Sequence, residues 1–196
     1  MSAIATRPDA QPVVVDLPPP DLQTTELHLV GLSPLISHRW SDKAKRQMLD
    51  KQQKKASIGK EAKDPEHDYQ ESLYVHPAGG YGFPTIAFKA AAVRAGTYAD
   101  MKMTFLRGAF HVIGELAQIE GEPRMREDMV RLQSGVADIR YRAEFPEWET
   151  TLPIRWNGRA VTLNQLVNLF RIAGFSVGVG EWRPEKDGSY GMFEVR

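Results

Sequence analysis

Residues 162–174, read TLNQLVNLFRIAG, decide the fold of this chain. Thr162 is the expected N-cap, and Gly174 is expected to close the helix. Between them the apolar residues recur at helical spacing, so the segment predicts an amphipathic helix with one face against a core. The residues of that stripe are Leu163, Leu166, Val167, Phe170 and Ala173.

Strand patterns lie on both sides of this helix. Two runs with alternating apolar and polar residues, 137–145 and 148–156, precede it, and the Pro146-Glu147 step between them predicts a hairpin. In the first run Ile139, Tyr141 and Ala143 face one way, while Arg140, Arg142 and Glu144 face the other. A glycine-rich loop and a last strand at 191–195 follow the helix.

The first half of the chain has a similar order. A strand at 26–32 ends at Ser33-Pro34, and a helix is predicted over 86–95, with Thr85 as N-cap and Gly96 just past its end. After Gly96 the pattern changes to strands at 110–113 and 116–119. Together the two halves predict the β-α-β-β-α-β order of the α+β ferredoxin-like fold, which the RNA-recognition fold also uses. That fold places both helices on one face of an antiparallel sheet.

Two segments stand outside this pattern. Residues 1–23 hold five prolines and are predicted to be an extended arm. Residues 24–196 then form one ferredoxin-like domain with a basic insertion at about 39–70. Within the insertion, residues 41–56 predict a helix with a thin apolar face, and Asp64-Pro65 is expected to end the segment. We expect residues 41–63 to be mobile in the free protein and ordered on a polyanion or a neighbouring subunit.

Charge is distributed unevenly along the chain. Its 25 basic and 25 acidic side chains cancel, yet residues 39–63 hold nine basic residues against three acidic ones. A basic segment on a neutral protein is typical of contact with a polyanion, and a lysine-rich solvated loop is the alternative.

The composition excludes several classes of protein. The chain has no cysteine, so it has no disulfide, no thiolate nucleophile and no cysteine-bound zinc. No apolar run approaches the length of a membrane-spanning helix, and residues 1–7 lack a signal-peptide pattern. We therefore expect a cytoplasmic protein with no membrane contact.

Three stretches resemble the RAMP superfamily, whose best-known members are the backbone subunits that coat guide RNA in CRISPR effector complexes. The first, GLSPL at 31–35, follows the opening strand; the second, GFPTIAFKAAAVR at 82–94, enters the first helix. The third, AGFSVGVGEWR at 173–183 with GSYGMF at 188–193, is similar to the glycine-rich loop before the family's last strand. The resemblance implies a ferredoxin-like fold and nucleic-acid binding. The family's acidic cleavage residue has no match in this chain, so it implies no catalysis.

Several residues are candidates for contact with a nucleic acid. Gly178 and Gly180 would let a phosphate approach the backbone, and Trp182-Arg183 would stack on a base and contact a phosphate. His38, Arg39 and Trp40 repeat this composition at the base of the insertion. The alternative for each is a loop that only turns or a tryptophan that only packs. The remaining candidates are cations, namely Lys43, Lys45, Arg46, Lys51, Lys54, Lys55, Lys89 and Arg94.

No enzyme motif is present. The histidines at 28, 38, 67, 76 and 111 show no metal-ligand spacing, and the glycines at 178–191 lack the G-x-G-x-x-G spacing of a dinucleotide site. We therefore predict no catalytic residue, no metal and no cofactor. The preferred hypothesis is a non-enzymatic protein that binds RNA or single-stranded DNA as repeated subunits, either as a homo-oligomer or within a larger complex. The alternatives are a phage structural or assembly subunit and a metal-independent ribonuclease of the RAMP type, which would use His28 or His38.

Overall fold

A four-stranded antiparallel sheet forms the centre of the molecule. The computed structural model describes residues 17–40, 42–54, 63–131, 135 and 137–196. The strand order is β10-β1-β9-β5, and each neighbouring pair is antiparallel. In chain order these strands are β1 (Leu22–Gly31), β5 (Phe110–Val112), β9 (Glu149–Asn157) and β10 (Phe193–Val195).

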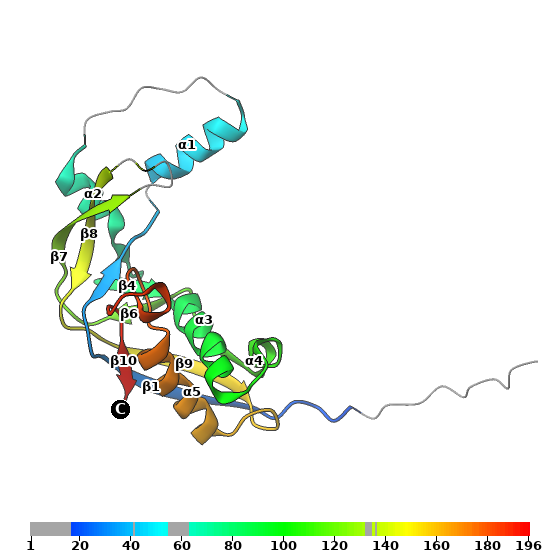
Figure 1. Ribbon diagram of the computed structural model, residues 1–196. Helices are drawn as coiled ribbons and strands as arrows, with labels where there is room; N and C mark the ends of the chain where they lie inside the picture. The colour runs from blue at the N-terminus through cyan, green and yellow to red at the C-terminus, as the bar shows by residue number, and fades with distance from the viewer. Residues whose placement is uncertain (1–16, 41, 55–62, 132–134, 136) are drawn as a thin grey trace, which may run out of the picture.

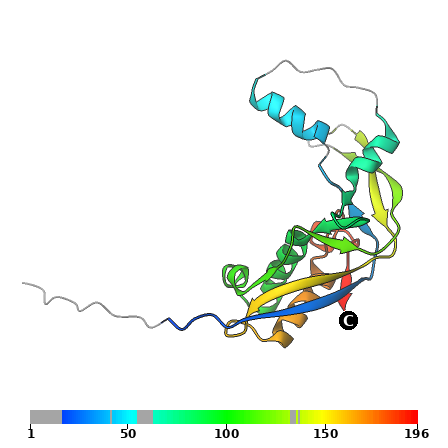
Figure 2. The ribbon, with the colours of Figure 1, turned by 180° about the vertical axis from the view of Figure 1, so that it is seen from behind.

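Two helices cover one face of this sheet. The first, α3 (Thr85–Ala95), lies between β1 and β5 in the chain, and the second, α5 (Leu163–Ser176), lies between β9 and β10. Figure 1 shows both helices in front of the sheet, and Figure 2 shows the sheet from its other side. The α+β class and the β-α-β-β-α-β order predicted from the sequence are therefore confirmed.

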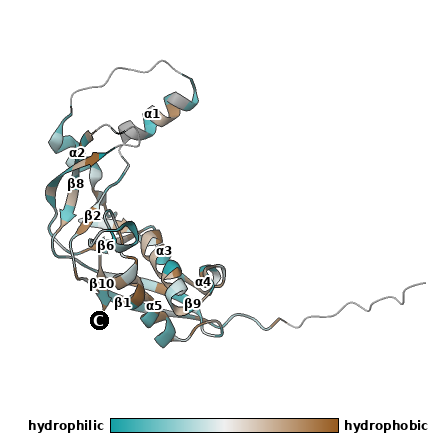
Figure 3. Cartoon of the chain, in the orientation of Figure 1, coloured by the Kyte–Doolittle hydropathy of each residue, from teal (hydrophilic) through white to brown (hydrophobic). Residues whose placement is uncertain are grey.

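The core lies between these helices and the sheet. Phe170 of α5 meets Phe110 of β5 edge to face, with ring centroids 5.8 Å apart. Phe88 of α3 and Phe193 of β10 make a similar contact at 6.0 Å. All four rings are fully buried, because each helix turns one apolar face inward. The mixture of apolar and polar residues along both helices can be followed in Figure 3.

Two smaller sheets extend the domain. One has the order β2-β8-β7 and the other β3-β4-β6. Their strands are β2 (Leu35–Ser37), β3 (Tyr74–Val75), β4 (Tyr81–Pro84), β6 (Leu116–Ile119), β7 (Arg124–Arg131) and β8 (Ala137–Phe145). Helices α1 (Asp42–Gln52) and α2 (Pro65–Ser72) lie at the β7–β8 end of the molecule, away from α5 (Figures 1 and 2).

The predicted hairpin across Pro146-Glu147 is wrong. The strand β8 pairs with β2 and β7, whereas β9 pairs with β1 and β5, so the two consecutive strands belong to different sheets. The reason lies beyond the turn: Trp148 is buried over Gly31 and donates a hydrogen bond to the carbonyl of Ser33, 2.9 Å away. This anchor directs the chain from one sheet into the next.

Gly174 does not close its helix. The helix α5 continues to Ser176, although its predicted start is confirmed by a capping box between Thr162 and Gln165. A Cβ at Gly174 would lie 1.9 Å from the carbonyl oxygen of Phe193 in β10. Glycine is therefore needed where α5 packs against β10. A helix-capping glycine would occupy the same position near the end of the apolar stripe, and this is why the sequence suggests a cap.

Two further boundary predictions are also wrong. Thr85 is the first residue of α3 after the cap position Pro84, and its hydroxyl donates to the carbonyl of Gly114 at 2.5 Å. Asp64-Pro65 begins a helix, because the Asp64 side chain accepts a hydrogen bond from the N–H of His67 and proline suits the first turn.

The segment after Gly96 is helical before it becomes a strand. It forms a short 3₁₀ helix, η1 (Gly96–Ala99), and then α4 (Met103–Ala109). Leu106 of α4 is fully buried, and its side chain occupies the space that a Cβ at Gly96 would need. The pattern in this stretch is too short for helical periodicity to be visible in the sequence. Among the described residues, no helix has the length and apolar character needed to cross a membrane.

Candidate nucleic-acid interface

The terminal loop, residues 177–192, packs against β2 and the turn before it. Glu181 N–H donates to the carbonyl of Ile36 at 3.1 Å, and Gly191 N–H donates to the carbonyl of Pro34 at 2.8 Å. Gly180 has φ +79°, and a Cβ there would lie 2.6 Å from the carbonyl oxygen of Ile36. Glycine at this position therefore serves a close backbone contact within the protein. Gly178 is similar, with φ +67° and Pro184 in the space that a Cβ would need.

The structure brings the two Arg/Trp segments together. His38 Nδ1 lies 3.3 Å from Glu181 Oε1, which joins the residues after β2 to the terminal loop. Trp40 is 56% exposed and Trp182 is 41% exposed. These segments are about 140 residues apart in the sequence, so only the tertiary fold makes them neighbours.

Trp182 is held in a strained backbone conformation. Its φ is +54°, a left-handed value that bulky residues rarely adopt. Tyr190 N–H donates to its carbonyl at 3.0 Å, and a Cβ at Gly188 would lie 1.7 Å from the same oxygen. The loop therefore closes tightly on the Trp182 backbone while much of the indole stays in solvent. Strain of this kind is found where a side chain is positioned for a function.

Arg183 and Arg94 share one carboxylate. Arg183 donates to Glu185 at 2.9 Å and to the carbonyl of Gly180 at 3.0 Å, and Arg94 Nε at the end of α3 lies 2.9 Å from Glu185. Both arginines thus stabilise the terminal loop and its contact with α3. Removing Arg183 would therefore disturb the loop as well as any phosphate contact that it makes.

The cations of the insertion are only partly described. Lys45, Arg46 and Lys54 are exposed, whereas Lys55 and the side chains of Lys43 and Lys51 lie outside the described residues. The predicted mobility of residues 41–63 falls partly on undescribed residues and stays a prediction. Arg39 donates to the carbonyl of Glu71 at 3.1 Å and so ties the base of the insertion to α2.

Lys89 lies apart from the other candidates. It belongs to α3, where its ammonium donates to the carbonyl of Arg107 at 3.1 Å and lies 3.0 Å from His111 Nδ1. It lines a cavity between α3 and β5 that the terminal loop does not reach. The structure therefore does not place Lys89 with the tryptophans.

Sequence reasoning missed a charged face on the β7–β8 pair. The predicted alternation in β8 is confirmed, and β7 adds matching residues to the same face. Arg126 joins the others: it lies 2.8 Å from Asp128 and 3.0 Å from Glu144, and its guanidinium stacks on the Tyr190 ring at 4.7 Å. The members of this charged face are Arg124, Arg126, Asp128, Asp138, Arg140, Arg142 and Glu144.

The alternation in β8 could have signalled this face. Its partners could not be read from the sequence, since the segment around 124–133 shows no clear strand pattern. The basic and acidic groups of the charged face nearly balance, so it is a network of ion pairs rather than a basic patch. It continues to the terminal loop, where Arg142 NH2 lies 4.0 Å from Glu181.

Glu181 connects the charged face to His38. A hydrogen bond with His38 and the nearby charge of Arg142 hold the pKa of Glu181 below its ordinary value, against the opposing effect of burial. A carboxylate with a lowered pKa stabilises the folded state above its unfolded pKa, and this contribution is lost as the pH falls through the lowered value. The contact between loop and β2 is therefore expected to weaken in acid.

The two histidines considered for a ribonuclease do not share a site. His28 pairs with Glu149 at 3.3 Å on the central sheet, and His38 pairs with Glu181 beside the loop. Neither lines the cavity between α3 and β5. Within the described residues no group of three or more metal-binding side chains gathers at one place.

Comparison with known proteins finds likeness in structure but not in sequence. No protein-family model and no curated protein matches the sequence. The fold is similar to the crystal structure of Cmr6 from Pyrococcus furiosus, with a TM-score of 0.44 and 11% identity. The match covers 90% of this chain and 99% of that one.

Proposed function

We propose that this chain is a non-enzymatic protein that binds single-stranded nucleic acid, RNA or DNA, along the surface formed by the terminal loop and the residues after β2. The observation that carries the proposal is Trp182, an indole 41% exposed to solvent on a backbone held at φ +54°. Tryptophan stacks on any base, and a rigid platform loses little entropy when it does so.

A second aromatic residue supports this assignment. Trp40, also exposed, follows the strand that the terminal loop pairs with, and the His38–Glu181 contact fixes one segment against the other. Two platforms on adjoining segments suit a strand whose bases are unpaired. Double-stranded nucleic acid would hide its base faces from both of them.

The charges suit moderate, salt-dependent binding. The charged face is largely neutralised by its own carboxylates, so the phosphate contacts fall to the insertion, whose residues 39–63 carry the excess of cations. We propose that this insertion and the N-terminal arm also make contacts between subunits repeated along the strand. A homo-oligomer and a larger complex are both compatible with that arrangement.

Removing the Trp182 indole tests the stacking role. Trp182→Asn keeps a residue that accepts the left-handed conformation and deletes the stacking surface. Stacking is worth roughly 1–3 kcal/mol per base, so we expect the affinity for a fluorescent oligonucleotide to fall by about tenfold or more. Trp182 is 41% exposed, so its buried part also contributes to packing. The melting temperature is therefore recorded with the affinity, and binding lost with the melting temperature kept supports the stacking role.

Phe105→Ala is the control, since Phe105 is 46% exposed on α4, which lies apart from the terminal loop (Figures 1 and 2). Fluorescence anisotropy at a fixed salt concentration measures the oligonucleotide affinity of both variants. Equal affinities for the parent and Trp182→Asn would count against the proposed surface.

The lysines of the insertion are tested by salt dependence. Replacing Lys51, Lys54 and Lys55 with alanine removes up to three phosphate contacts and should weaken binding about equally for all base sequences. The log–log slope of affinity against salt should flatten by roughly 0.7 for each lost single-strand contact. A slope that matches the parent's would assign these lysines to solvent or to protein partners.

A further inference from the structure

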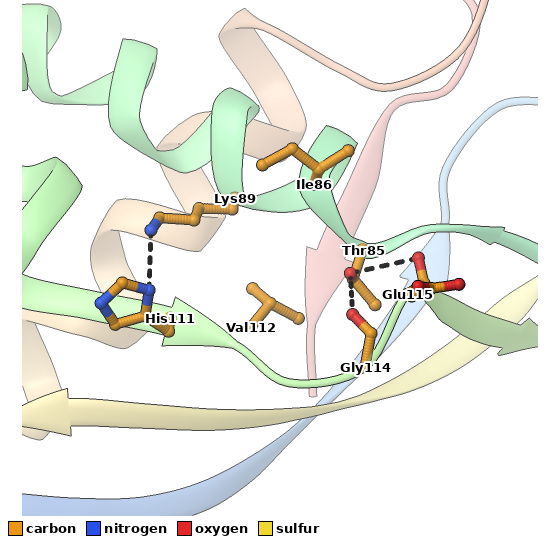
Figure 4. A pocket seen from close by; sticks show the side chains of 7 residues that line it. All are labelled: Thr85, Ile86, Lys89, His111, Val112, Gly114 and Glu115. Atoms are coloured by element: carbon orange, nitrogen blue, oxygen red, sulfur yellow. Dashed lines mark hydrogen bonds between the residues drawn. The ribbon is translucent and has the colours of Figure 1, made fainter.

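A cavity lies between α3 and β5, on a different part of the domain from the terminal loop. It has a volume of about 420 Å³, within the range of small-molecule sites. Figure 4 shows Lys89 and His111 at one end, Glu115 and Gly114 at the other, and two apolar side chains between them. The two ends of the cavity differ in charge and in hydrogen-bonding groups, so each end selects a different part of the ligand.

The first end offers hydrogen-bond donors and a positive charge. The Lys89 ammonium has three N–H donors; one is directed to the carbonyl of Arg107 and another to His111 Nδ1, 3.0 Å away. Among the described residues no carboxylate forms an ion pair with it. The third N–H of the ammonium is directed to neither the Arg107 carbonyl nor His111 and can donate to a ligand. Burial lowers the pKa of Lys89, and a bound anion would compensate that lost solvation.

The opposite end offers acceptors. The Glu115 side chain is exposed; the carbonyl of Gly114 accepts from the hydroxyl of Thr85, and the carbonyl of Glu115 accepts from the Thr85 N–H at 3.0 Å. A carboxylate with neighbouring carbonyl oxygens repels an anion and attracts an N–H group. A simple phosphate or a fatty acid would satisfy only the first end. The ligand must therefore join an anion to a donor group.

The middle of the cavity suits a flat ring. Ile86, on the first turn of α3, is 66% exposed, and Val112 of β5 lies half-buried opposite the helix. Figure 4 shows both between the cationic and the acceptor ends. An exposed isoleucine on the wall of a cavity is apolar surface that a planar group can cover.

We infer that this cavity binds a nucleoside monophosphate whose base carries an amino group, with the phosphate at Lys89 and His111, the base over Ile86 and Val112, and the amino group at Glu115. Adenosine and cytidine monophosphates have this arrangement of groups, and uridine monophosphate lacks the amino group. The site is independent of the strand binding proposed above. Its ligand is either a free nucleotide or one nucleotide of a bound strand, since both present the same chemistry.

Calorimetric titration of the full chain tests the inference. Adenosine monophosphate and cytidine monophosphate should bind saturably, whereas adenosine, ribose 5-phosphate and uridine monophosphate should each bind about tenfold more weakly, because each loses one set of contacts. Lys89→Met should weaken the binding of adenosine monophosphate about tenfold. Lys102 is an exposed lysine outside the cavity, so Lys102→Met should leave that binding unchanged. Glu115→Gln should reduce the preference for adenosine over uridine monophosphate.

His111→Gln is a second variant in case Lys89→Met unfolds, and the melting temperature of each protein is recorded. The inference is overturned if adenosine monophosphate shows no saturable binding. It is also overturned if the parent, Lys89→Met and His111→Gln all bind adenosine monophosphate equally well. A competition experiment distinguishes the two sources of the ligand, a free nucleotide and one nucleotide of a bound strand. An oligonucleotide that displaces adenosine monophosphate from the parent assigns the site to a bound strand, and one that does not assigns it to a free nucleotide. Trp182→Asn should leave adenosine monophosphate binding unchanged, because Trp182 does not line the cavity. The cavity and the strand-binding surface are thus tested independently.

Discussion

Gly174→Ala should lower the stability of this protein by about 3 kcal/mol, although alanine is the better helix former by about 1 kcal/mol. The new Cβ would lie 1.9 Å from the Phe193 carbonyl oxygen and 2.8 Å from the carbonyl carbon of the same residue. These are backbone atoms of β10, which cannot rotate away, so helix and strand must separate. Chemical denaturation followed by circular dichroism measures the change.

The same substitution elsewhere provides the control. Gly108 lies in the last turn of α4, is exposed, and would have no atom within 4 Å of a new Cβ. Gly108→Ala should therefore be neutral or stabilising by up to about 1 kcal/mol. Opposite signs for one substitution at two helical glycines would establish that the α5–β10 contact, and not helix propensity, requires glycine. If Gly174→Ala stabilises the protein as Gly108→Ala does, that contact is looser than described.

Arg126→Met should have a similarly large effect. Arg126 bonds Asp128, Glu144 and the hydroxyl of Tyr190, and both carboxylates are buried. Burial opposes its charge, but the hydrogen bonds to Asp128 and Tyr190 outweigh burial and raise its pKa. Without Arg126, Asp128 keeps Arg142 and Glu144 keeps Arg124 as cationic partners, and losing one member of a buried ionic network costs about 3 kcal/mol. Thermal and denaturant unfolding measure the loss.

Arg124→Met is the matched control. Arg124 also bonds Glu144, with a distance of 2.7 Å, but its side chain is 65% exposed. An ion pair so open to solvent contributes at most about 1 kcal/mol. Combining Arg126→Met with Glu144→Gln should recover part of the loss, because the second change removes a buried carboxylate whose remaining cation, Arg124, is largely exposed. Equal losses for the two arginine variants would contradict the network described for this face.

The sequence alone determined the order of the central elements. The apolar stripe at 162–174 and the alternation at 148–156 are local patterns, and each follows from one face meeting a core. Such patterns survive because a helix or strand with one buried face must repeat its apolar residues at a fixed spacing. The alternation in β8 is also present, but Arg142 and Glu144 are buried there and Ile139 is 42% exposed, so that pattern does not mark an apolar face against the core.

Only the tertiary structure decided which strands pair and which residues share a site. The Pro146-Glu147 step looks like a hairpin from the sequence, but Trp148 over Gly31 sends the next strand to β1 instead. Gly174 looks like a helix end until β10 lies against it. His38 and Glu181, and Lys89 and His111, become neighbours through contacts between distant segments. A local pattern shows which face of a helix or strand is buried. It does not identify the element that packs on that face, because many partners of similar size and polarity would fit the same pattern.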